Sequence, residues 1–125
     1  MTIVIIAGGR DYQPTQDSAI WLSQMHQHLG GIQGVVYGGA PGADDFGRRW
    51  AQDLNIPVKL FAADWNKHGP AAGPIRNQQM ADFLLLYPKR AVLLFPGGRG
   101  TQSMRGIARK HQISVYDFPS STPTP

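Results

Sequence analysis

Glycine-rich segments follow three aliphatic runs of the sequence, and they carry residue types that bind anions. The segments are Gly-Gly-Arg-Asp-Tyr at 8–12, Gly-Gly-Ala-Pro-Gly-Ala-Asp at 38–44 and Pro-Gly-Gly-Arg-Gly-Thr at 96–101. Glycine lets backbone N–H groups approach a ligand that a Cβ would keep away. Helices that begin near Asp44 and Thr101 would add free N–H donors and the positive end of the helix dipole. We therefore expect these segments to bind phosphate, with residues 97–101 as the main cradle.

The long connection at residues 62–77 adds an arginine to this set. Long ordered connections in small domains are often functional. Pro74 is typical of the first turn of a helix, and this would place Arg76 and Asn77 in the opening turn. Arg76 could clamp a phosphate through two N–H groups, which is the interpretation we favour, or it could pair with Asp64 to hold the connection.

The aromatic and titratable side chains of these segments have competing interpretations. Trp65, like Tyr12, could stack on a base or a ribose; the alternative, which we favour for Trp65, is that it covers the core at the rim. Asp44 either caps the helix that begins beside it or contacts a ribose hydroxyl. His68 could act as a general acid or base, although a lone histidine in a loop is more often a solvated polar residue.

The candidate ligand-binding residues come from four segments. They are Gly8, Gly9, Arg10, Asp11, Tyr12, Gly38, Gly39, Ala40, Gly42, Asp44, Trp65, Arg76, Asn77, Pro96, Gly97, Gly98, Arg99, Gly100 and Thr101. Arg10, Arg76 and Arg99 would neutralise the charge of a phosphate. The sequence has neither the G-x-G-x-x-G of dinucleotide-binding folds nor a P-loop with its lysine, which disfavours an ordinary NAD dehydrogenase or P-loop NTPase. We expect a nucleotide ligand and no required cofactor.

The elements that must position these residues follow from the apolar pattern. Short aliphatic runs predict strands at 3–7, 35–37, 58–61, 91–95 and 114–116. The segments between them have the apolar spacing of helices, as at Leu22, Met25 and Leu29. This alternation predicts a three-layer, Rossmann-like, doubly wound α/β fold: a mainly parallel sheet of about five strands with helices on both faces. Parallel strands end at one edge of a sheet, so the glycine-rich segments should gather there.

Length and composition limit the remaining classes of protein. The 125 residues suit one Rossmann-like domain over 1–118, and the final residues 119–125, poor in apolar side chains, predict a flexible tail. There is no cysteine, and no histidine and carboxylate spacing indicates a metal site. We expect neither a signal peptide nor a membrane span, and therefore a cytoplasmic protein. The net charge of +4, without a run of lysine or arginine, allows an anionic partner but does not favour nucleic acid.

Four motifs occur in a fixed order along the chain. They are Gly-Gly-Arg-Asp-Tyr, Gly-Gly-Ala-x-Gly-Ala-Asp, Ala-Asp-Trp-x-x-x-Gly-x-x-Ala-Gly-x-x-Arg-Asn and Phe-Pro-Gly-Gly-x-Gly-Thr. Together they resemble the YspA-like, cpYpsA-related branch of the SLOG superfamily, long carried as a domain of unknown function. The resemblance implies a nucleotide-like ligand, because SLOG relatives include nucleotide sensors, the LOG-type phosphoribohydrolases and the DNA-binding Rossmann domain of the DprA/Smf group. Relatives often form homodimers, so the resemblance also implies a homodimer.

The resemblance bears on catalysis as well. In the LOG enzymes the proline-glycine-glycine motif continues Gly-Thr-x-x-Glu, and that glutamate is taken as catalytic with help from an arginine. Arg76 corresponds to the arginine, whereas Met104 stands where the glutamate would be, and a thioether cannot act as a general base. The favoured hypothesis is therefore a nucleotide-binding protein that could act as a sensor. The alternatives are an N-glycosidase or phosphoribohydrolase that uses Asp44, Asp64 or His68 in place of the glutamate, and a protein that binds single-stranded nucleic acid.

Overall fold

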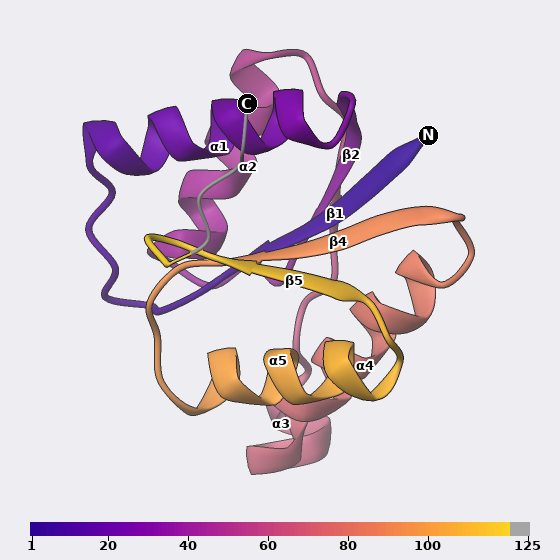
Figure 1. Ribbon diagram of the computed structural model, residues 1–125. Helices are drawn as coiled ribbons and strands as arrows, with labels where there is room; N and C mark the ends of the chain where they lie inside the picture. Colours follow the sequence, from indigo (N-terminus) through magenta and orange to yellow (C-terminus); the bar gives the residue numbers. More distant parts are fainter. Residues whose placement is uncertain (121–125) are drawn as a thin grey trace.

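The computed structural model describes residues 1–120 and shows a five-stranded sheet between two layers of helices (Figure 1). The strands are β1 (Thr2–Ala7), β2 (Ile32–Tyr37), β3 (Val58–Leu60), β4 (Lys89–Leu94) and β5 (Ser114–Asp117). The helices are α1 (Gln16–His28), α2 (Ala43–Asp53), α3 (Trp65–His68), α4 (Ala72–Leu84) and α5 (Arg99–Lys110), with a 3₁₀ turn, η1 (Gly69–Ala71), between α3 and α4. The strand order is β3-β2-β1-β4-β5, and every pairing is parallel. The predicted doubly wound α/β fold is confirmed.

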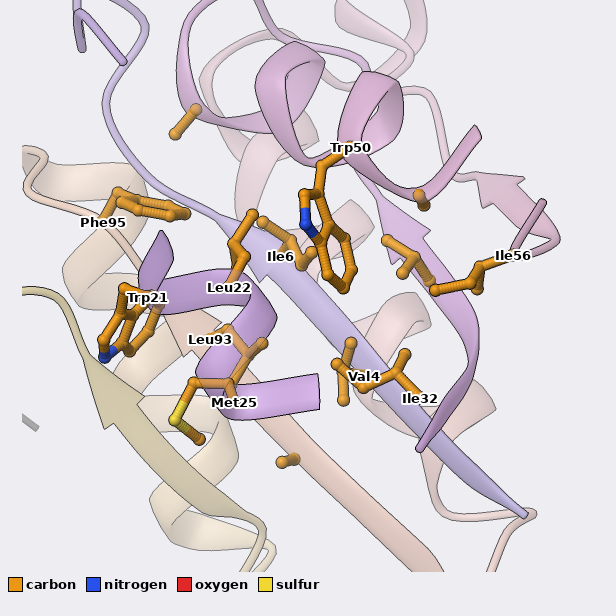
Figure 2. Close-up of a cluster of buried hydrophobic side chains, with 14 residues drawn as sticks. Val4, Ile6, Trp21, Leu22, Met25, Ile32, Trp50, Ile56, Leu93 and Phe95 are labelled. Atoms are coloured by element: carbon orange, nitrogen blue, oxygen red, sulfur yellow. The ribbon is translucent and has the colours of Figure 1, made fainter. Parts of the chain in front are cut away.

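The central strand, β1, is buried along its whole length, which explains its unbroken apolar sequence. Its side chains alternate between two hydrophobic clusters, because successive residues of a strand point to opposite faces. Val4 and Ile6 belong to the cluster that contains Leu22 of α1 and Trp50 of α2 (Figure 2). The other cluster contains alternate β1 residues and side chains from α4 and α5; its β1 members are Ile3, Ile5 and Ala7. The sheet therefore carries α1 and α2 on one face and α4 and α5 on the other (Figure 1).

The connection from β3 to α4 is more regular than a loop. The side chain of Asp64 caps α3, because its Oδ1 accepts a hydrogen bond from the backbone N–H of Lys67 at 3.1 Å. The turn η1 then continues into α4, whose first residue, Ala72, donates its N–H to the carbonyl of Gly69. As a result α4 begins before Pro74, and the prediction that residues 76–77 lie in its opening turn is wrong. They lie in the second turn instead.

An ion pair helps to hold the end of the described chain. Arg105 of α5 binds Asp117 of β5 through both carboxylate oxygens, at 2.5 and 2.6 Å, and this contact holds α5 against the sheet. Residues 121–125 lie outside the described residues, so the tail at 119–125 and the domain boundary at 118 stay predictions. Within residues 1–120, no helix has both the length and the apolar composition that crossing a membrane requires.

Candidate ligand-binding cleft

A cleft of about 1130 Å³ lies along the edge where the parallel strands end. Residues from the connections after β1, β2, β3 and β4 all line it. β1 and β4 are neighbours in the sheet, but they lead to helices on opposite faces, so the chain leaves a gap between their two connections. Open α/β sheets bind ligands at such a switch point. The volume is large enough for a nucleotide, since small-molecule sites commonly measure roughly 300–1,000 Å³.

The structure brings nearly all of the predicted residues to this cleft. All but one of the candidate ligand-binding residues line it; the exception, Gly42, precedes α2 with a φ of 78°. Of the candidate catalytic residues, Asp44 and Arg76 line the cleft, whereas Asp64 and His68 are not among its lining residues.

Asp44 is the buried carboxylate of the cleft, with 4% of its surface exposed. Its Oδ2 accepts the backbone N–H of Gly38 at 3.1 Å, and the N–H groups of Gly8 and Ala40 also bond to the carboxylate. Asp44 lies inside the first turn of α2, past the N-cap position Gly42, and its carboxylate bonds to amides of other segments, so the capping hypothesis is wrong. Asp44 instead joins the connections after β1 and β2. Three amides that we expected to face an anionic ligand are therefore partnered by the protein itself.

The burial of Asp44 changes its acidity. Desolvation raises the pKa of this carboxyl from 3.8 to about 6, although the charge of Arg76 and the three backbone N–H groups act in the opposite direction. Burial likewise lowers the pKa of the Arg76 guanidinium, and the charge of Asp44 opposes that change. A carboxylate in a cleft that titrates near pH 6 has the acidity that acid–base chemistry at neutral pH requires.

Arg76 reaches from α4 to the end of β2. Its Nη1 donates to the carbonyl of Gly38 at 2.6 Å, and its Nε donates to Oδ1 of Asn77 at 3.0 Å. This approach requires glycine at position 38, because a Cβ there would lie 2.6 Å from Cζ of Arg76 and 2.9 Å from Oδ2 of Asp44. Within residues 1–120 Arg76 forms no ion pair with Asp64, so the alternative role that we gave it is wrong. Its Nη2 has no partner in that range and can reach a ligand.

Asn77, 3% exposed, ties α4 to α5. Its Nδ2 donates to the carbonyl of Gly100 at 3.2 Å and to Oγ of Ser103 at 3.4 Å. The chain of bonds from Arg76 through Asn77 therefore leads to the first turn of α5. Ser103 and Leu60 also line the cleft, although neither was singled out in the sequence. In the sequence, Ser103 follows the glycine-rich turn and Leu60 ends a predicted strand, and these positions were the signals that could have identified them.

Among residues 1–120, no side chain caps the backbone amides at the start of α5. Gly98 precedes the helix, no side chain caps its first turn, and that turn contains no acidic residue. The first turn of α2, in contrast, carries two acidic residues. Residues 96–100 are exposed, so the N–H groups of Arg99 and Gly100 and the positive end of the helix dipole open onto the cleft. This turn has the chemistry of an anion-binding site.

The connections after β1 and β4 are held together beside this turn. The N–H of Gly9 donates to the carbonyl of Pro96 at 2.9 Å. The ring of Tyr12 packs on Phe95 of the core, with ring centroids 5.0 Å apart, which leaves it partly buried. Arg10, on the same connection, is exposed and lines the cleft. At the α5 end of the cleft, an exposed arginine therefore adjoins two connections that are hydrogen-bonded to each other.

Trp65 lies at the other end of the cleft and is 54% exposed. It belongs to neither hydrophobic cluster, so it does not cover the core as we favoured. Within residues 1–120, no group of three or more histidine, aspartate or glutamate side chains is placed to hold a metal ion.

Comparison with known proteins agrees with the motifs and the fold. A family model described as "YspA, cpYpsA-related SLOG family" matches residues 2–68, from β1 to the end of α3. The chain belongs to this SLOG family. The resemblance drawn from the motifs is thereby confirmed. SLOG domains are associated with the binding of nucleotide-derived ligands.

The family match does not include α5, but the similarity to another protein covers nearly the whole chain. The chain is 34% identical to the Gene 61 protein of Mycobacterium phage D29 over 128 residues, which cover 94% of this chain and 97% of the phage protein. Because so little of either chain is left out, the similarity includes the glycine-rich turn at 96–101. The aligned region therefore spans all the segments that line the cleft.

Proposed function

We propose that this SLOG protein binds a nucleotide or a nucleotide-derived phosphate in the cleft, without a required cofactor, and acts as a sensor or carrier of that ligand. The observation that supports the proposal is the uncapped start of α5, whose free N–H groups open onto the cleft between Arg10 and Arg99. Free backbone amides, a helix dipole and arginine side chains together favour a phosphate.

The phosphate binds at α5 rather than at the turns after β1 and β2. The amides of Gly8, Gly38 and Ala40 already bond to Asp44, and that carboxylate, when ionised, would repel a second anion placed there. Arg76 lies between the two positions, and its free Nη2 can bond to a ribose hydroxyl or a phosphate oxygen.

Isothermal titration with nucleoside monophosphates, NAD and ADP-ribose tests this function. We expect at least one of them to bind more tightly than millimolar, and Arg99→Ala to weaken that binding roughly tenfold. Arg109→Ala, which removes a charge from the last turn of the same helix, is the matched control and should leave the affinity unchanged. A folded protein that binds none of these compounds would overturn the proposal.

A second candidate function, hydrolysis of the N-glycosidic bond, is favoured by Asp44. It is the buried carboxylate of the cleft, and its raised pKa leaves it ionised but still basic at neutral pH. It could therefore replace the glutamate that Met104 displaces, with Arg76 beside it. Incubation with nucleoside monophosphates and NAD, followed by chromatography, should then release a free base, and Asp44→Asn should abolish the release. No turnover above the uncatalysed rate would refute this candidate.

A further inference from the structure

The cleft has two chemically different ends. At the α5 end the lining includes Arg10, Asp11 and Arg99. The lining from the end of β3 to η1 is uncharged and apolar: Leu60, Ala62, Ala63, Trp65 and Pro70. Leu60 and Trp65 are 51% and 54% exposed, and they are the large exposed hydrophobic side chains of the cleft. Ligand pockets are lined mainly by apolar and aromatic side chains, so this end of the cleft has the chemistry of a binding surface.

Trp65 is held in place without being buried. The side chain of Asp64 caps the helix that begins with Trp65, which fixes its backbone. The far edge of the indole ring lies beside Gly73 in the first turn of α4, where even an added Cβ would stand 3.4 Å from Cη2. More than half of the Trp65 surface nevertheless remains exposed, and the residue lines the cleft. Tyr12, the other aromatic candidate, is packed against the core instead.

We infer that Trp65 and Leu60 form a subsite for the aromatic base of the ligand. This inference rests on the proposed function: the phosphate lies on the start of α5, and the base stacks on Trp65 at the β3 end. β2 and β1 separate β3 from β4, so the ends of β3 and β4 are three strand spacings apart, roughly 14 Å. An extended nucleotide can bridge such a distance, whereas a free phosphate cannot. The ligand class is therefore a nucleotide with an intact base, not a sugar phosphate.

The contacts of α4 explain why the two subsites act on one ligand. Asn77 bonds to the first turn of α5, and Gly73, one turn earlier in α4, lies against Trp65. Both ends of the cleft are thus fixed to the same helix. Stacking of a base on an aromatic side chain strengthens binding roughly 5- to 150-fold per base. We expect the nucleotide to bind more tightly than the corresponding sugar phosphate by a factor in this range.

Fluorescence gives a direct readout, because the three tryptophans differ in exposure. Trp21 and Trp50 are 4% and 8% exposed, so acrylamide quenches mainly Trp65. Saturating AMP, GMP, CMP or UMP should protect Trp65 from acrylamide, whereas ribose 5-phosphate at saturation should not. Trp65→Phe should remove the protectable component of the emission.

Titration calorimetry on variants completes the test. Trp65→Ala should weaken binding of the preferred nucleoside monophosphate roughly 5- to 150-fold and leave ribose 5-phosphate unaffected, and Trp65→Phe should restore most of the nucleotide affinity. Leu86→Ala, which removes a side chain that is 74% exposed and lies outside the cleft, is the matched control. Equal affinity for nucleotide and ribose 5-phosphate, unchanged in Trp65→Ala, would overturn the base subsite and leave the proposed function intact. Absence of binding by all of these phosphates would overturn both.

Discussion

Asp44 takes the backbone amides that glycine-rich turns commonly offer to a phosphate. The three N–H groups that it accepts come from the ends of β1 and β2, and it is buried beside Arg76. The protein thus keeps an internal anion at one position of the rim and leaves the amides of α5 free at another. At the scale of single residues, the position of the Asp44 carboxylate therefore determines where the negative charge of a ligand can bind.

The acidity of Asp44 should appear in the stability of the protein. Its pKa is about 6 in the folded state and 3.8 in the reference state, so the folded protein holds a proton that the unfolded chain releases between these values. The stability contributed by the protonated form is complete below pH 3.8 and is lost as the pH rises through 6. Relative to Asp44→Asn, the wild-type free energy of unfolding should therefore fall by roughly 2 kcal/mol between pH 4 and pH 7. Urea denaturation of both proteins across this range measures the difference; a difference that does not vary with pH would contradict the environment described for Asp44.

Position 38 provides a second test at this scale. In Gly38→Ala the new Cβ would overlap the Arg76 guanidinium and crowd the Asp44 carboxylate, so we expect a loss of roughly 1–3 kcal/mol in the free energy of unfolding. Gly106→Ala is the control, because no atom lies near an added Cβ in the interior of α5, and it should stabilise the protein by roughly 0.5–1 kcal/mol. Thermal denaturation should show shifts of opposite sign. Equal shifts would argue against the contact of Arg76 with Gly38.

At the scale of elements, the missing N-cap of α5 should affect both the stability of the protein and the binding of the ligand. Gly98→Asp would supply the missing cap in open space, and it would place a negative charge where we expect the phosphate. The substitution should raise the free energy of unfolding by roughly 0.5–1 kcal/mol and abolish nucleotide binding. Denaturation and calorimetry on the same sample measure the two effects. Gly98→Asn caps the helix without a charge, so it should stabilise the protein similarly and weaken binding less.

The strands and long helices could be predicted from the sequence because their apolar spacing reflects burial. The run at 3–7 is buried on both faces in the structure, and the glycine-rich segments follow the ends of strands as expected. The four residues of α3 gave no such signal, since one turn of helix has no periodicity and depends on the Asp64 cap. The partner of Asp44 could not be predicted either, because its carboxylate bonds to residues on other elements.

At the scale of the whole molecule, the strand order explains how distant segments form one site. The connections after β1 and β4 adjoin because their strands are neighbours, although some 90 residues separate them in sequence. The β3 end brings the apolar lining to the same cleft, and α4 braces both ends. The candidate site residues gather for this topological reason, and the sequence pattern of alternating strands and helices was sufficient to predict it.

The most direct test of phosphate binding at α5 is an NMR titration of the ¹⁵N-labelled 13.7 kDa protein with AMP and ADP-ribose. We expect the largest shifts at the amides of residues 97–101, with smaller changes at Gly8, Gly38 and Ala40, whose N–H groups remain bonded to Asp44. The opposite pattern, with large shifts at those three amides and none at residues 97–101, would contradict it.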